Sequence, residues 1–260
     1  MSETATKFQL PTPTTTVSRV AVSFGMAGLL MLFGAISFPV PWTPVPFSLI
    51  PLGLLMAGAV QRAGWGALSV IIYLLAGAMG APVLAEGESG WRHFAGATAG
   101  YLFAFPLVSA MVGAYVRQPR ELPSWLRRGL ITGFLTSAVA GIAVVAWLWN
   151  QDGTLGGDYT LGGSVLWALV WVTAACIAMA VWNLRRTSDH GPALSMWIVM
   201  MGAILLLHGV GVTGLWIIGD FALIEAIAYG SIVFLPFDTI KAGLAVAATL
   251  PFLPSESNDA

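Results

Sequence analysis

Charged residues are scarce in this sequence. Aspartate, glutamate, lysine and arginine together make up 9% of its 260 residues, whereas 57% of the residues are apolar. Soluble domains carry roughly a quarter charged residues, because a surface that faces water needs them. The apolar residues come in blocks of about 20, the length that a helix needs to cross the hydrocarbon core of a bilayer. The composition therefore excludes an ordinary soluble domain and predicts a multi-pass protein of the cell membrane.

Several kinds of chemistry are absent as well. Cys176 is the single cysteine, which excludes an internal disulfide and a cysteine-based metal site. Lysine occurs only at Lys7 and Lys241, neither of them after a glycine-rich loop, so the sequence has no P-loop for ATP. The HExxH and GxSxG patterns of hydrolases are missing too. We therefore expect no enzymatic activity, no cofactor and no metal, and the net charge of −1 excludes a broad basic surface for nucleic acid.

The apolar blocks predict eight transmembrane helices, whose ends are marked by proline, glycine or charge. The predicted spans are 18–37, 46–60, 66–83, 97–116, 129–149, 163–183, 193–218 and 222–252. Nearly all lysines and arginines outside the spans fall in alternate connections, which places both termini in the cytoplasm. The polar segments 1–17 and 255–260 are expected to be tails, the first of them disordered.

The segment 117–191 stands apart from the rest of the chain. It holds two of the predicted spans, with an arginine-rich linker before them, another after them and a loop with Gly and Asp between them. Because two added spans return the chain to the side of the membrane where it started, the later helices keep their orientation whether or not these two spans are present. We interpret this segment as a transmembrane hairpin inserted into a six-helix core, which is formed by 18–116 and 192–254.

Two charges lie inside the last predicted span. Asp238 and Lys241 are three residues apart, so they share one face of a helix in an apolar segment. A charge at membrane depth costs at least ~2.5–3.5 kcal/mol, so the pair needs a compensating role. One interpretation is an ion pair that only locks helix packing. The other, which we favour, is a pair that contacts a polar ligand in a water-accessible pocket.

Polar residues elsewhere offer weaker signals. His208 is another ionisable residue deep in a late span, where an interhelical hydrogen bond is its simpler interpretation. Glu88 and Arg92 belong to the 84–96 loop, which the charge pattern places on the outer side. The 38–46 segment lies on the same side, and its four prolines remove backbone donors, which is tolerated at membrane depth where the backbone is buried or lines a cavity.

Small residues mark one face of the first predicted helix. Ala21 and Gly25 form a small-xxx-small pair, and Gly28 extends it. Such a surface allows another helix to approach closely. That helix belongs either to this chain or to a partner subunit, and the pattern alone does not distinguish the two.

Seven short segments follow one another in a characteristic order. They are Gly34-Ala-Ile-Ser-Phe-Pro-Val-Pro, Thr43-Pro-Val-Pro-Phe-Ser-Leu, Leu54-Leu-Met-Ala-Gly, Gly66-Ala-Leu-Ser-Val-Ile-Ile-Tyr, Gly80-Ala-Pro-Val-Leu, Gly96-Ala-Thr-Ala-Gly-Tyr-Leu-Phe-Ala-Phe-Pro and Phe234 to Ala242. Together they resemble the BioY family, the biotin-specific substrate-binding (S) components of energy-coupling-factor (ECF) transporters. The likeness covers about 35–116 and 205–250 and leaves out 117–191.

The resemblance implies an architecture and partners. It implies a six-helix S component that binds biotin in a pocket open to the outside and capped by the first and third outer loops. Such proteins join a transmembrane coupling subunit and two ATP-binding subunits, so ATP would be used only by the partners. Small residues of the first helix face the coupling subunit in this family, which matches Ala21 and Gly25.

The resemblance also implies site residues. The Asp and Lys of the last-helix motif contact the ligand in this family, and they correspond to Asp238 and Lys241. Gly100 and Tyr101 match a glycine-aromatic element before the fourth core helix. Pro46 belongs to the Pro-Val-Pro segment that shapes the first loop.

Some positions depart from the family pattern. Ile50 stands where the family often has Gln, Glu88 where some members have Asn, and Leu102 where some have a basic residue. Phe237 replaces the Gly of the usual Pro-Gly-Asp. These positions concern ligand recognition, and Glu88 and Arg92 become candidate contacts, with Arg92 as a replacement partner for a ligand carboxylate.

The sequence thus predicts high-affinity capture and membrane uptake of biotin by the S component of an ECF-type transporter. Two alternatives stay open. The first is a stand-alone carrier of a small carboxylate or vitamin that is driven by a gradient, with Asp238, Lys241 and His208 as a proton relay. The second is a membrane-embedded lipid-modifying enzyme, for which the sequence offers no nucleophile or metal set.

Overall fold

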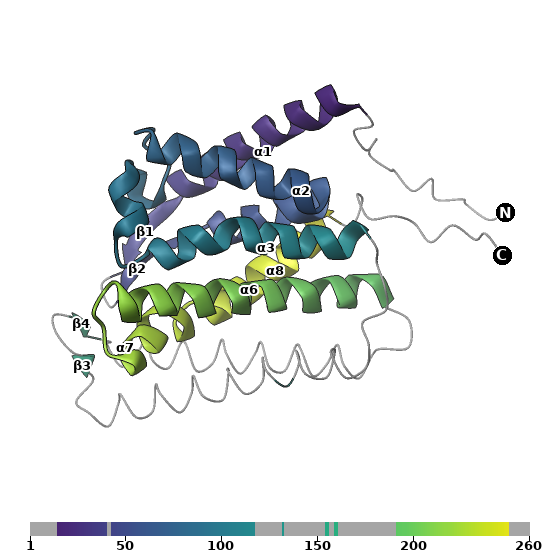
Figure 1. Cartoon of the computed structure of the whole chain (residues 1–260). Helices are drawn as coiled ribbons and strands as arrows, with labels where there is room; N and C mark the ends of the chain where they lie inside the picture. Colours follow the sequence, from purple (N-terminus) through teal and green to yellow (C-terminus); the bar gives the residue numbers. More distant parts are fainter. Residues whose placement is uncertain are drawn as a thin grey trace.

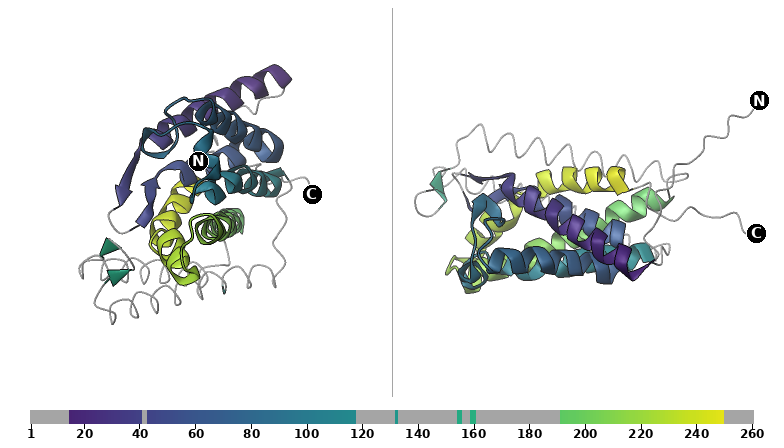
Figure 2. Two further views of the ribbon diagram at one scale, coloured as in Figure 1. Left: turned by 60° about the vertical axis from the view of Figure 1, so that its left-hand side comes forward. Right: turned by 90° about the horizontal axis from the view of Figure 1, so that it is seen from above.

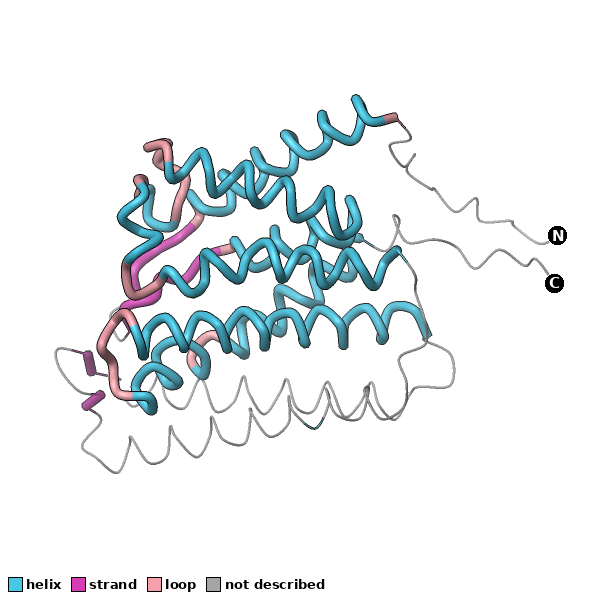
Figure 3. Tube along the Cα trace, in the orientation of Figure 1, coloured by secondary structure: helices cyan, strands magenta, loops and turns pink. Residues whose placement is uncertain are grey.

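Long helices lie side by side in this chain, and strands and short turns gather at one end of them (Figure 1, Figure 3). The computed structural model describes residues 15–40, 43–117, 132, 154–155, 159–160 and 191–249. Its longer helices are α1 (Thr16–Ala35), α2 (Ile50–Ala78), α3 (Ala99–Arg117), α6 (Gly191–Ile217) and α8 (Leu235–Thr249). Five helical stretches of the described residues are long and apolar enough to cross a membrane. The predicted helical membrane fold agrees with this architecture.

The element α2 consists of two helical halves that fold back on each other. Arg62 interrupts it with φ 68° and ψ 174°, which are not helical values. A Cβ built on Gly66 would lie 2.7 Å from the carbonyl oxygen of Ala57, although nine residues along one helix would separate them by about 13 Å. The halves before and after Arg62 therefore correspond to the predicted spans 46–60 and 66–83.

A β-hairpin replaces the start of the predicted 46–60 span. Strand β1 (Ser37–Val40) pairs antiparallel with β2 (Thr43–Ser48), and Ser37 lies opposite Ser48. The helix begins only at Ile50, because the prolines of 43–48 fix extended backbone and cannot donate hydrogen bonds, as is tolerated in an edge strand. The prediction of an all-helical chain missed this hairpin.

The last predicted span, 222–252, is divided into three elements. It comprises α7 (Leu223–Ile227), a π-helical turn η3 (Ala228–Ile232) and α8, which are separated from α6 by a turn at Asp220. Turns of π-helix often occur at functional sites, because their wider spacing leaves carbonyl groups free to bond elsewhere. One such carbonyl takes part in the site described below.

The loop end of the bundle is defined here as residues 37–48 and 81–98. Besides the β-hairpin it contains two 3₁₀ turns, η1 (Ala85–Gly87) and η2 (Trp91–Ala95). The helices run away from it along roughly one direction (Figure 2). The opposite end of the bundle holds the reversal at Arg62.

Glycines bring the central helices into contact. A Cβ on Gly58 would lie 2.3 Å from the Ser109 carbonyl oxygen, and one on Gly100 would lie 2.4 Å from the Val210 carbonyl oxygen. A larger residue at Gly58 would therefore push α2 away from α3, and one at Gly100 would push α3 away from α6. Buried apolar side chains fill the interior, and large apolar residues such as Leu75 and Phe103 stay more than half exposed, as suits a surface that faces lipid.

Part of the predicted organisation lies outside the described residues. The spans 129–149 and 163–183 of the proposed hairpin fall there, as do residues 1–14 of the predicted tail 1–17 and the whole predicted tail 255–260. Within 117–191, the structure describes two short strands, β3 (Thr154–Leu155) and β4 (Tyr159–Thr160), which pair antiparallel. The inserted hairpin, the count of eight helices and the cytoplasmic termini stay predictions.

Candidate ligand-binding site

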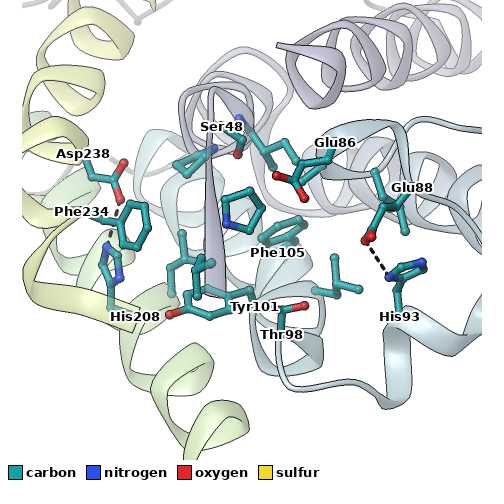
Figure 4. Close-up of a pocket in the computed structure, with 18 of the residues that line it drawn as sticks. Ser48, Glu86, Glu88, His93, Thr98, Tyr101, Phe105, His208, Phe234 and Asp238 are labelled. Carbon is teal, nitrogen blue, oxygen red and sulfur yellow. Dashed lines mark hydrogen bonds and ion pairs between the residues drawn. The ribbon is translucent and has the colours of Figure 1, made fainter. Parts of the chain in front are cut away.

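A cavity of about 200 Å³ opens between the loop end and the helices. Its walls come from β2, both halves of α2, the 81–98 loop, α3, α6 and α8. Figure 4 shows that side chains from opposite sides converge on it. The lining residues are Pro44, Val45, Pro46, Ser48, Ile50, Pro51, Tyr73, Leu84, Ala85, Glu86, Glu88, His93, Thr98, Tyr101, Leu102, Phe105, Leu207, His208, Phe234, Asp238 and Lys241. Mostly apolar walls with a few convergent polar groups are typical of a small-molecule site.

An ionic cluster forms one end of this cavity. The Lys241 Nζ donates to Asp238 Oδ1 at 2.6 Å, and His208 Nε2 lies 2.9 Å from Asp238 Oδ2. All three residues are at least 95% buried. The three-residue spacing on α8 places Lys241 beside Asp238, and the packing of α6 on α8 brings His208 to the same carboxylate. Each charge is therefore compensated, as burial in an apolar interior requires.

The π-helical turn η3 holds this cluster in place. The Gly230 carbonyl oxygen lies 2.8 Å from His208 Nδ1 and also accepts a hydrogen bond from the Tyr101 hydroxyl. Next to it, the Tyr229 carbonyl accepts from the Thr43 hydroxyl at 2.8 Å. One turn thus ties α3, α6 and β2 to the segment that leads into Asp238.

The cluster retains bonding capacity for a ligand. A lysine ammonium has three donors, and a carboxylate has about four acceptor positions, of which Asp238 uses one on each oxygen. Lys241 Nζ also lies 4.3 Å from the ring centroid of Phe47, which holds the charge at the cavity wall. The arrangement can therefore receive a molecule that carries donors and an acceptor side by side.

The other end of the cavity is formed by the 81–98 loop. Glu88 Oε2 pairs with His93 Nδ1 at 2.9 Å, and the Glu88 side chain is 52% exposed. Glu86 lines the cavity nearby, with its backbone in the left-handed region at φ 61°. Its backbone N–H donates to the Ser37 hydroxyl, which itself donates to the Gly34 carbonyl at 2.7 Å. The loop is thereby connected to the end of α1.

Most of the predicted site residues line the cavity, and two do not. Those that line it are Pro46, Glu88, Tyr101, Asp238 and Lys241, together with the departure positions Ile50 and Leu102. Gly100 instead packs against Gly214 and the Val210 carbonyl, where it lets α3 approach α6. Arg92 is exposed on η2 and is not among the lining residues.

The interface predicted on α1 faces outward. Ala21 and Gly25 are exposed, and a Cβ on Gly25 would meet no described atom within 4 Å. The face is open to another helix in the described part of the structure. Its role as an interface with a partner subunit stays a prediction.

Tyr73 was not predicted from the sequence. It lines the cavity, is fully buried, and its hydroxyl has no hydrogen-bond partner among the described residues. A signal was available, because Gly66, Ser69, Tyr73 and Gly77 recur at intervals of three or four and mark one buried helix face. That pattern indicates burial but not whether the hydroxyl points to a protein group or to a ligand.

A comparison with protein-family models decides the family. The model of the BioY family matches residues 4–187 and 151–256, which together span nearly the whole chain. The chain belongs to the BioY family. Membership in this transporter family agrees with the apolar helices in making it a multi-pass membrane protein, and it supports transport rather than catalysis.

Curated BioY relatives align with part of the chain. A probable biotin transporter BioY of Methanothermobacter thermautotrophicus is 33% identical over 110 residues, which are 41% of this chain and 70% of the relative. The biotin transporter BioY of Thermotoga maritima is 32% identical over 127 residues, which are 49% of this chain and 69% of the relative.

A solved structure shares the fold. It is the crystal structure of the S component for biotin from an ECF-type ABC transporter, which superposes with a TM-score of 0.58. The match covers 91% of this chain and 93% of the other, at 18% sequence identity. This BioY chain therefore has the fold of an S component.

Proposed function

We propose that this BioY protein binds biotin in the cavity and delivers it across the membrane as the S component of an ECF-type transporter. The observation that carries the proposal is the buried pair of Asp238 and Lys241 at the cavity wall. The biotin head is a cyclic urea, with two N–H donors next to one carbonyl acceptor. Asp238 would accept from an N–H group while Lys241 donates to the carbonyl oxygen, so head and pair are complementary.

The surroundings of this pair suit the remainder of the head group. Phe234, Leu207 and Phe105 give apolar surface to the cavity. The fused sulfur-containing ring of biotin is apolar, and its burial there would add to affinity through the hydrophobic effect. The names of the BioY relatives and of the structural neighbour, which all refer to biotin, support the same ligand.

The proposal includes an orientation and partners. The loop end would face the outside, where biotin enters, and the termini would lie in the cytoplasm. The exposed small residues Ala21 and Gly25 would contact a transmembrane coupling subunit, and ATP would be bound only by separate ATP-binding subunits. The segment 117–191 would add a hairpin to a six-helix core and make eight spans.

Equilibrium binding of biotin to the purified, detergent-solubilised chain tests the ligand. We expect tight binding that Asp238→Asn and Lys241→Ala each weaken by a factor of ten or more, about 1.4 kcal/mol. Gln61→Asn, at the far end of the bundle, is a control that should bind like the wild type. A folded wild-type chain that does not bind biotin would refute the proposal, and other vitamins and small carboxylates would then be screened.

A stand-alone carrier is the second candidate, and one contact favours it. His208 bridges the Gly230 carbonyl and Asp238, so it stands beside the ion pair in a position to move a proton. Uptake by the chain alone in liposomes separates the two candidates. Uptake that collapses with the proton gradient supports the carrier, whereas uptake that needs ATP and partner subunits supports the S component.

A further inference from the structure

The two ends of the cavity differ in charge. Lys241 is the only lysine or arginine that lines the described cavity, and Asp238 already pairs with it. The opposite end holds two more carboxylates, Glu86 and Glu88 (Figure 4). Glu88 pairs with His93, whereas Glu86 has no ion-pair partner among the described residues. This end therefore has acceptors in excess and no permanent cation.

Tyr73 supplies a neutral donor at the same end. A Cβ on Gly34 would lie 3.3 Å from the Tyr73 hydroxyl oxygen, and the Gly34 carbonyl accepts from Ser37, which in turn accepts from the Glu86 N–H. These contacts place the hydroxyl on the Glu86 side of the cavity. Tyr73 is fully buried, and its hydroxyl has no hydrogen-bond partner among the described residues. Burial of an unpaired hydroxyl costs stability unless a ligand supplies the missing partner.

A ligand with its head on the ion pair extends its tail toward this end. A free carboxylate there would lie beside two partly exposed glutamates, and the repulsion would not be offset, because Arg92 does not line the cavity. Either group can accept a hydrogen bond from the Tyr73 hydroxyl, but only the carboxamide also has an N–H that can donate to a glutamate carboxylate.

We propose that this cavity selects the carboxamide form of its ligand, that is, biotin whose tail is capped by an amide bond, over biotin with a free carboxylate. The inference rests on the proposed function, since it assumes that the cyclic urea occupies the Asp238 end. It deepens that function by naming the chemical form of the substrate. A cationic group beyond the amide would bind at least as well, because the glutamates then attract it.

Competition binding with two probes tests this inference. Biotin and biotinamide differ only at the end of the tail, so the ratio of their dissociation constants isolates the charge at that position. Because both glutamates are partly screened by solvent, each is worth a factor of about three to five, and we expect biotinamide to bind roughly tenfold more tightly. A biotin amide that ends in a primary amine should bind as tightly as biotinamide or more tightly.

Variants of the glutamates locate the effect. The double variant Glu86→Gln, Glu88→Gln should reduce the tenfold preference to less than about threefold, mainly by improving the binding of biotin. Asp220→Asn is the matched control, because it removes one negative charge in the α6–α7 turn outside the cavity lining, and asparagine tolerates its positive φ. The control should keep the tenfold ratio.

The outcomes separate this inference from the function on which it rests. If biotin binds as tightly as biotinamide or more tightly, the tail selectivity is refuted while the biotin site stands, and the tail carboxylate is then placed in solvent. A preference that survives the double glutamine variant also overturns it. If neither probe binds to the folded chain, the proposed function fails, and this inference fails with it.

Discussion

Two buried polar clusters lie at opposite ends of the same bundle, and of these two the cluster around Asp238 lines the cavity described above. At the far end, Ser23 donates to Gln61 at 2.8 Å, and Gln61 donates to Ser69 at 2.9 Å. This cluster is neutral, and its members satisfy one another. The cluster of Asp238, Lys241 and His208 is ionic and keeps unused donors and acceptors at the cavity wall.

The comparison distinguishes polar groups that hold helices together from polar groups that are available to bind a ligand. The neutral cluster joins α1 to both halves of α2 just before the reversal at Arg62, so its bonds fix how these segments meet. The ionic cluster carries a larger desolvation cost than packing alone would justify. A cost of that kind is recovered when the charges are used in binding.

The largest effect is expected from Asp238→Leu. The change leaves Lys241 and His208 buried without their common acceptor, which should lower the free energy of unfolding by about 3–5 kcal/mol and abolish ligand binding. Thermal unfolding in detergent and equilibrium binding measure the two effects. An unfolding free energy within 1 kcal/mol of wild type would show that the cluster is not ionic.

Gln61→Leu breaks the other cluster. Ser23 and Ser69 lose their shared partner while buried, which should cost about 1–3 kcal/mol of stability. The dissociation constant for the ligand should stay within threefold of wild type, because the change is remote from the cavity. A loss of binding in the folded variant would mean that the two clusters are coupled.

Tyr73→Phe sharpens the comparison, since it removes a buried polar group that neither cluster satisfies. We expect the ligand-free chain to gain about 1 kcal/mol of stability, because an unpaired hydroxyl is no longer buried. Affinity for biotinamide should fall by a factor of about three to ten. Stability and affinity that fall together would instead assign the hydroxyl a structural partner.

The smallest effect is expected from Arg62→Gly. At φ 68° and ψ 174° the backbone lies in a region that suits glycine, so the substitution should relieve strain and raise stability by up to about 1 kcal/mol. Binding should be unchanged. Destabilisation would show that the arginine side chain contributes more than its backbone strain costs.

The sequence predicts those features of this protein that depend on neighbouring residues. Apolar blocks located the described helices, and the three-residue spacing of Asp238 and Lys241 placed them together. The fold-back at Arg62 was anticipated as a boundary between two spans. Family motifs identified Pro46 and Tyr101, which line the cavity.

Features that depend on distant segments were not predicted. The contact of His208 with Asp238 joins residues 30 apart, and that of Tyr101 with Gly230 joins residues 129 apart. Both require knowledge of how α3, α6 and α8 pack. The β-hairpin was missed because proline-rich extended backbone has no apolar periodicity. A loop sequence also does not show which of its side chains turn inward, and the structure places Arg92 outside the cavity lining.

The π-helical turn η3 also sets the angular phase of the last helix. A residue in an α-helix advances by about 100°, so the extra residue of a π turn rotates everything that follows it relative to a continuous α-helix. Deletion of one residue from Ala228–Ile232 would turn Asp238 and Lys241 about a quarter of a circle away from the cavity, with their own spacing intact. The direction in which Asp238 and Lys241 point thus depends on backbone conformation at least six residues before Asp238.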